Sequence, residues 1–253
     1  TLKLDGFNRP QNKSFAAKRH QKLAFSVPVS WPAATPTATA NLLAIDPLMR
    51  ACGASDPVAV AATTVAPIAP AHVRYTELDD TTSVKTVSIS YRRRSGASHN
   101  ERQIANGRGV QKFKWKSGEV PRFDFDFLGA WKAMAQVVAL DGTLGTQLTN
   151  IAQPSNATNT VSVLLNGKGL CAVEISDDNL WRMKTAITET LCGTGPVHQV
   201  LEDSSLDVTF KMPNITSEFN PDLYWGNDYP FEFTIKGDGT LNSRSMRFSW
   251  ALV

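Results

Sequence analysis

Two runs of alternating apolar and polar residues lie close together near the middle of the chain. The first run, 112–116, alternates lysines with aromatic residues, and the second, 123–127, alternates phenylalanines with aspartates. Such alternation is typical of strands that have one face in a core and the other in water. Because only the short segment 117–121 separates the two runs, the pattern predicts an antiparallel β-hairpin.

The two faces of this hairpin predict its register. With a loop at 117–121, we expect opposite charges to meet on one face and aromatic rings to meet on the other. Each such cross-strand pair stabilises by about 0.2–1 kcal/mol. A slip by one residue would turn every side chain to the wrong face. We interpret the hairpin as a framework element, with these expected pairs: Lys114 with Asp124, Lys112 with Asp126, Phe113 with Phe125, and Trp115 with Phe123.

Further alternating runs indicate that most of the chain forms strands. The 253 residues are 42% hydrophobic and 19% charged, which is typical of a globular protein. We expect a mainly β fold, an antiparallel β-sandwich or partly closed barrel with one or two short flanking helices and long loops. A flexible N-terminal arm, 1–22, would precede a single domain, 23–253. The other expected strands are 23–29, 87–91, 161–165, 170–175, 180–187, 206–212, 230–235 and 246–252.

Local signals predict the helices and turns. Asp46 is expected to cap a short helix, Pro47 suits its first turn, and Gly53 suits its end. A second short helix is possible at 130–136. Turns are expected at Asn166-Gly167, a dipeptide that favours hairpins, and at 237–239.

Several short motifs together resemble a known protein family. They are Gly107-Arg108-Gly109, the loop 117–121, the alternating strand that ends in Gly129, and the segment 46–53, which reads Asp-Pro-Leu-Met-Arg-Ala-Cys-Gly. Taken in the order in which they occur along the chain, these motifs resemble the major tail tube proteins of long, flexible-tailed (siphovirus-type) bacteriophages. The resemblance covers about residues 40–253. The chain departs from the usual pattern at Asn106-Gly107, Ser117 and Val120.

The resemblance implies a structural virion protein. Copies would form six-membered rings that stack into the tail tube, the conduit through which genomic double-stranded DNA is ejected. The partners would be other copies of the chain, the tape measure, terminator and distal tail proteins, and DNA in transit without sequence-specific binding. We expect the protein in the phage tail, in the host cytoplasm during assembly, and not at a membrane.

Charge is distributed unevenly along the chain. Residues 83–122 hold ten basic and two acidic residues, whereas 201–253 hold four basic and eight acidic ones. The polar segment 92–103 is expected to be a hairpin tip or protruding loop that docks on an adjacent copy, with Arg92, Arg93, Arg94 and Arg102 as contacts. Because unpaired cations bind phosphates, we expect a neutral or acidic lumen, with Asp124 and Asp126 as candidate lumen-facing residues.

Other functional classes find less support in the sequence. No catalytic motif or metal-ligand spacing occurs, so we expect neither an enzyme nor a bound cofactor or metal. The cysteines Cys52, Cys171 and Cys192 are widely spaced, and we expect small buried hydrophobic residues that form neither a disulfide framework nor a zinc site. No apolar run approaches the ~20 residues that cross a membrane. The printed sequence opens without an apolar leader, and we expect no secretion.

Three alternatives remain open. One is another ring-forming tail component, such as a terminator, baseplate or secretion-tube-like protein. Another is a β-barrel that binds single-stranded nucleic acid, because 112–116 interleaves aromatics with lysines. Alternation, however, places the aromatics and the lysines on opposite faces. The third is a carbohydrate-binding β-sandwich.

Overall fold

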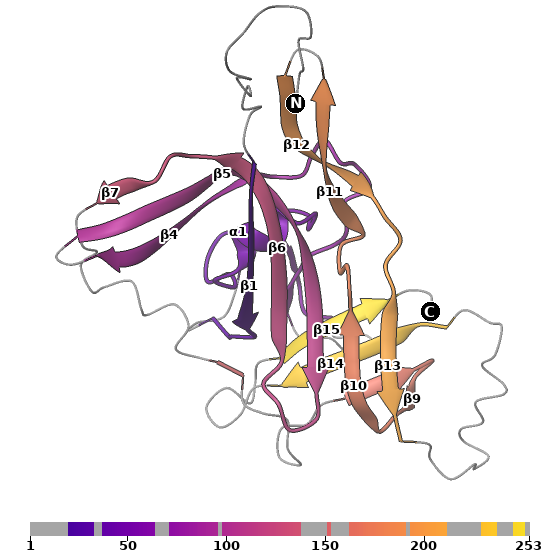
Figure 1. Cartoon of the computed structure of the whole chain (residues 1–253). Coiled ribbons are helices and arrows are strands. Elements are labelled where there is room, and N and C mark those ends of the chain that lie inside the picture. The colour runs from indigo at the N-terminus through magenta and orange to yellow at the C-terminus, as the bar shows by residue number, and fades with distance from the viewer. Residues whose placement is uncertain are drawn as a thin grey trace, which may run out of the picture.

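The hairpin predicted from the alternating runs lies at the centre of a seven-stranded antiparallel sheet (Figure 1). The computed structural model describes residues 20–32, 37–63, 71–95, 98–137, 151–152, 162–190, 193–211, 229–236 and 245–250. The order across the sheet is β1-β6-β5-β10-β13, and β4 and β7 pair with the first half of β5. The strands are β1 (His20–Pro28), β4 (Val87–Ser95), β5 (Ser98–Lys116), β6 (Arg122–Trp131), β7 (Ala135–Val137), β10 (Ala172–Asp177) and β13 (Leu206–Phe210).

Three smaller sheets complete the described strands. A four-stranded sheet has the order β15-β14-β8-β9, and β11 with β12 and β2 with β3 form two-stranded ribbons. Their bounds are β2 (Val58–Val60), β3 (His72–Arg74), β8 (Ser162–Leu165), β9 (Lys168–Gly169), β11 (Met183–Thr190), β12 (Gly193–Leu201), β14 (Phe231–Lys236) and β15 (Ser245–Trp250).

The core lies between the large sheet and the four-stranded sheet. Phe113 of β5 contacts Phe248 of β15 and Phe233 of β14, with ring centroids 4.5 and 5.6 Å apart. Trp115 also contacts Phe233, at 5.2 Å. The mainly β, sandwich-like fold expected from the sequence is therefore confirmed. The described strands of the large sheet run from β1 at one edge to β13 at the other without closing.

The predicted faces of the central hairpin are confirmed, but its Cα register is shifted by two residues. Lys112 lies opposite Asp124, and Phe113 lies opposite Phe123. The turn is centred on Gly118, whose positive φ of 85° suits a tight turn, so Val120 continues towards the strand instead of extending the loop. The predicted Phe113–Phe125 and Trp115–Phe123 pairings are therefore wrong.

A bulge bends β5 at Asn106 and Gly107. The register between β5 and β6 shifts between Ala105 and Arg108, and Asn106 has a positive φ of 49°. The extra residue changes the alternation, so that Ile104 before the bulge and Phe113 after it are both buried. Beyond the bulge, β4, β7 and the start of β5 extend away from the rest of the sheet (Figure 1). We call this extension, residues 87–95, 98–105 and 135–137, the arm; it is distinct from the N-terminal arm predicted at 1–22.

One short helix packs under the large sheet. α1 (Asp46–Arg50) ends near Gly53 as predicted, and the backbone N–H of Gly109 in β5 donates to the carbonyl of Ala51, 3.1 Å away. Asp46 does not cap the helix, because Ile45 is at the N-cap without a side-chain hydrogen bond. The Asp46 carboxylate is buried instead and accepts hydrogen bonds from Tyr75 and Arg50.

The prediction of a possible second short helix at 130–136 is wrong. β6 continues to Trp131, and β7 then pairs with residues 99–101 of β5, near the tip of the arm. A helix this short is unstable by itself, whereas residues 135–137 form backbone hydrogen bonds with β5. Strand pairing therefore prevails over the local helix propensity.

Most of the other expected elements are present with shifted ends. β1, β4, β8, β10, β11, β13, β14 and β15 correspond to predicted strands, and Asn166-Gly167 forms the β8–β9 turn. β12 was not predicted. β1 begins at His20, so the last three residues of the predicted N-terminal arm belong to the sheet. Residues 1–19 and the turn expected at 237–239 lie outside the described residues.

Candidate functional site

The arm carries the arginines that the sequence singled out. Arg92 lies opposite Glu101, and the Arg92 Nε lies 3.2 Å from the Glu101 Oε1. Hydrogen bonds from Ser90 and Arg92 hold the pKa of Glu101 below its usual value. Arg92 is therefore engaged within its own chain. Arg94 lies in β4 opposite His99.

The opposite face of the arm is exposed and mixes apolar and cationic side chains. The cross-strand pairs Tyr91–Arg102 and Arg93–Asn100 place these four residues on one side of β4 and β5. Together with Met134 they line a shallow hollow of about 220 Å³. Tyr91 is 45% exposed and Met134 is 56% exposed. This set, which we call the arm face, presents large apolar surface beside two guanidinium groups that have no ion pair within the described residues.

The polar face of the large sheet carries the candidate lumen residues. Asp126 of β6 lies 3.5 Å from the Lys22 ammonium and 3.6 Å from the Lys112 ammonium. Asp124 lies 3.3 Å from the Lys114 ammonium. It also accepts a short hydrogen bond from the hydroxyl of Ser26.

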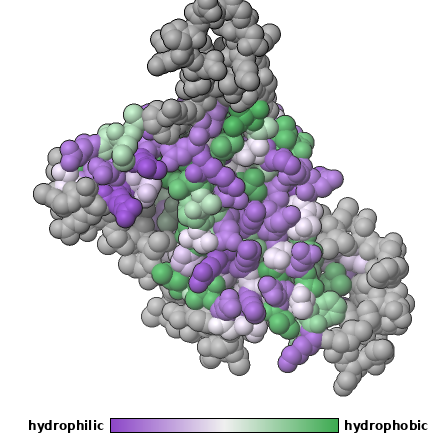
Figure 2. Space-filling model, viewed as in Figure 1, coloured by the Kyte–Doolittle hydropathy of each residue, from purple (hydrophilic) through white to green (hydrophobic). Residues whose placement is uncertain are grey.

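The ion pairs expected from the sequence are thus confirmed, although they join diagonal and not opposite positions. Figure 2 shows hydrophilic residues gathered over this face, along β5 and β6. On this face three more cations of β5 and β6, Arg108, Lys116 and Arg122, have no ion pair among the described residues, and Arg108 donates a hydrogen bond to the carbonyl of Val84.

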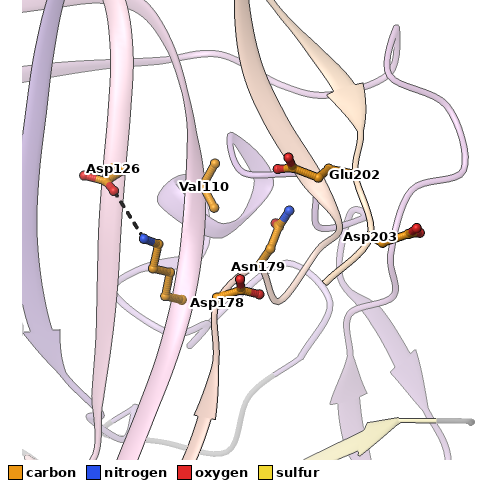
Figure 3. A pocket seen from close by; sticks show the side chains of 7 residues that line it. Val110, Asp126, Asp178, Asn179, Glu202 and Asp203 are labelled. Carbon is orange, nitrogen blue, oxygen red and sulfur yellow. Dashed lines mark ion pairs between the residues drawn. The ribbon is translucent and has the colours of Figure 1, made fainter. Parts of the chain in front are cut away.

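A second hollow, of about 290 Å³, lies where β10 ends and β13 begins (Figure 3). Its lining holds four carboxylates and one ammonium group. Glu202 pairs with Lys184, and Asp203 pairs with Arg182, while Asp178 accepts a hydrogen bond from the backbone of Ser205. We call this lining the acidic hollow: Val110, Lys112, Asp126, Asp178, Asn179, Glu202 and Asp203.

Asn179 forms part of the acidic hollow and is 4% exposed. Its Oδ1 accepts a hydrogen bond from the backbone N–H of Met183, 3.0 Å away, and this bond fixes the orientation of the amide. Its Nδ2 then has no hydrogen-bond partner within the described part of the chain. In Figure 3 the amide points into the space between Val110 and Glu202. The sequence analysis did not predict this hollow, because its walls come from segments far apart in the chain that only the fold brings together.

Asp177, next to the acidic hollow, is buried and joins the two layers of the sandwich. Its carboxylate accepts hydrogen bonds from the backbone of Asn179, at 2.9 Å, and from the indole of Trp250 in β15, at 2.8 Å. Burial raises the pKa of Asp177, and these hydrogen bonds oppose part of the rise. The carboxylate faces structural partners and not a cavity that a substrate could enter.

Both edges of the large sheet are open within the described residues. β1 pairs only with β6, and β13 pairs only with β10. On the polar face, the outward residues of β1 include Lys22 and those of β13 include Asp207. An open edge presents unpaired backbone N–H and C=O groups that another strand can bind.

Among the described residues no three His, Cys, Asp or Glu side chains gather in a way that would hold a metal ion. No helix that the structure describes has the length and apolar character needed to span a bilayer. Cys52 and Cys171 are free thiols. Cys52 is buried as predicted, and burial raises the pKa of its thiol. Cys171 is exposed, so the prediction of burial is wrong for it, and Cys192 lies outside the described residues.

No protein-family model and no curated protein matches this chain.

Proposed function

We propose that this chain is a structural subunit that joins copies of itself into six-membered rings, and that the rings stack into the tail tube of a long, flexible-tailed bacteriophage. The two open edges of the large sheet support this proposal most directly. A β1 edge and a β13 edge on one subunit are two different surfaces, so pairing between neighbours is head-to-tail, and such pairing forms a ring when the rotation from one subunit to the next closes. The number six and the phage context rest on the motif resemblance.

The polar face of the sheet suits the wall of such a ring. Edge pairing turns the large sheets of all subunits into one continuous sheet whose aromatic face stays inside each subunit. The face with Asp124 and Asp126 is then directed to the lumen. Lys22, Lys112 and Lys114 are paired with these carboxylates, so the face offers few free cations to phosphates. Weak attraction lets DNA slide, whereas release of counterions by many free lysines would hold it.

Single-strand nucleic-acid binding through the central hairpin is a weaker candidate. Phe113 is fully buried and Trp115 is 5% exposed, both on the core face. Bases stack only on exposed rings, so these aromatics offer no stacking platform.

Negative-stain electron microscopy of the purified chain tests the proposal. Stacked rings or tubes with a continuous central channel are expected at high protein concentration. Single rings that never stack would favour another ring-forming tail component. Monomers at every concentration tested would contradict the proposal.

A further inference from the structure

The two open edges of the large sheet run in the same direction. The path β1-β6-β5-β10-β13 contains four strand contacts, and each of them is antiparallel. An even number of reversals restores the first direction, so β13 points the same way as β1. Figure 1 shows the arrows of both strands pointing to the same end of the sheet.

We propose that neighbouring subunits join by parallel pairing of β13 with the β1 strand of the next copy. This inference rests on the proposed ring and adds the direction of the strands at its seam, the contact between the β13 edge of one copy and the β1 edge of the next. Rotation about the axis of a ring keeps the direction of each strand along that axis. The seam is therefore parallel, whereas a two-fold axis perpendicular to the sheet would pair β1 with β1, or β13 with β13, as antiparallel strands.

Both edges carry apolar side chains that one subunit covers only in part. These residues pair with buried positions of β6 and β10 and therefore share the core face. Pairing of the two edges joins them into one apolar layer and removes them from water, which is favourable. A second copy of the chain is thus a partner that suits both edges. The residues are Phe25 and Val27 of β1, and Leu206 and Val208 of β13.

The charges on the polar face favour the parallel direction. Lys22 of β1 has a side chain that is 67% exposed, and Asp207 and Lys211 are exposed at the other edge. When 207–211 lies beside 22–26 in parallel, Asp207 is next to Lys22 of the neighbouring copy and Lys211 is at the far end. The antiparallel alignment of the same residues places Lys211 opposite Lys22, and like charges directly opposite each other destabilise a strand pair.

Disulfide cross-linking of the full chain reads the direction whatever the register. In a background of Cys171→Ser and Cys192→Ser, each variant carries Asp207→Cys or Thr209→Cys on the polar face of β13. Each of these is combined with one cysteine substitution on the polar face of β1. Thermal unfolding identifies the variants that fold like the wild type, and microscopy identifies the conditions under which they form rings. The β1 positions are His20, Lys22, Ala24, Ser26 and Pro28.

The best β1 partner should move with the position on β13. Mild oxidation forms a disulfide only between Cα atoms within about 7 Å, and positions two residues apart are separated by about 6.6 Å along a strand, so one partner should dominate for each β13 position. In a parallel seam the best partner of Thr209→Cys lies two residues later in β1 than the best partner of Asp207→Cys. Lys168→Cys, at an exposed position of β9, replaces the β1 cysteine as a control and should give no covalent oligomers.

The outcomes separate this inference from the proposed function. A partner of Thr209→Cys that lies earlier in β1 than that of Asp207→Cys would show an antiparallel seam. Rings without any cross-link between these edges, or an equal yield with the Lys168→Cys control, would show that the edges do not pair. Each of these results overturns the parallel seam, while rings that stack into tubes still support the proposed function. A wild-type chain that stays monomeric at every concentration overturns both.

Discussion

Gln199 of β12 donates a hydrogen bond from its Nε2 to the carbonyl oxygen of Gly109 in β5, 2.7 Å away and 90 residues earlier in the chain. The same Nε2 lies 3.4 Å from the carbonyl of Ala51, just after α1. Gln199 is 2% exposed, so water cannot replace these contacts. One side chain thus fixes the β11–β12 ribbon to both the sheet and the helix, beside the acidic hollow.

Replacing this amide should loosen the ribbon. Gln199→Leu keeps a similar volume but leaves the Gly109 carbonyl without its donor, which costs about 1–3 kcal/mol. Chemical denaturation measures the change in the free energy of unfolding. Val200→Ala, at the exposed neighbouring position, should cost less than about 1 kcal/mol. Equal losses for the two variants would mean that the buried amide has no special role.

The buried carboxylate of Asp46 gives a second stability prediction. The hydroxyl of Tyr75 donates a hydrogen bond to the carboxylate of Asp46, 2.8 Å away, and Asp46 is only 4% exposed. Tyr75→Phe removes this donor and leaves the buried carboxylate with one hydrogen-bond partner fewer. We expect a loss of about 1–3 kcal/mol in the free energy of unfolding. The matched control is Tyr91→Phe in the exposed arm face, which should be nearly neutral. No loss for Tyr75→Phe would show that Arg50 alone satisfies Asp46.

Asp177 should make stability depend on pH. Burial raises the pKa of Asp177, so the folded state keeps the proton to a higher pH than the unfolded state does. Ionisation of this carboxyl therefore costs stability as the pH rises from about 4 through the folded-state value. Asp177→Asn cannot ionise.

Denaturation of both proteins across this pH range isolates the effect. The free energy of unfolding of the wild type minus that of Asp177→Asn should fall as the pH rises, and then level off. A difference that grows with pH would mean that the two hydrogen bonds outweigh the burial.

The ion pairs on the polar face predict that the chain binds duplex DNA weakly. Asp124→Asn with Asp126→Asn removes the partners of Lys22, Lys112 and Lys114. We expect duplex DNA to bind this variant about tenfold or more tightly than the wild type at 50 mM salt, and the gain to disappear near 200 mM. Fluorescence anisotropy with labelled DNA measures both affinities.

A control should separate local pairing from total charge. Asp56→Asn with Asp79→Asn gives the same change in net charge, and Asp56 pairs with Arg50 and Lys85 near α1. An equal gain in affinity for this control would show that net charge, and not the polar face, governs binding.

The central hairpin shows how far alternation predicts a sheet. Period two assigned Phe113 and Asp124 to their correct faces, because a face is fixed by parity alone. The register also depends on where the turn lies. Because the turn is centred on Gly118, the Cα register differs by two residues from the predicted one. The Lys112–Asp126 ion pair formed nevertheless, since long side chains reach diagonal neighbours across a twisted sheet.

The features that the sequence did not predict depend on contacts between distant segments. β12 contains Gly193, Gly195 and Pro196, which argue locally against a strand, yet β11 supplies a pairing partner. The acidic hollow brings Asp126 together with Glu202, and no local pattern encodes that approach. The same holds for the arm face, where Met134 joins Tyr91 only because β7 pairs with β5.

Cross-linking of the two sheet edges tests most directly whether copies complete one another. In a chain with Cys171→Ser and Cys192→Ser, cysteine is placed at Asp207 of β13 and, in separate variants, at Lys22, Ala24 or Ser26 on the outward side of β1. Mild oxidation of assembled protein should give, for at least one variant, a ladder of covalent oligomers that ends at six. If tubes form but all three variants yield only monomers on a denaturing gel, pairing of β1 with β13 is contradicted.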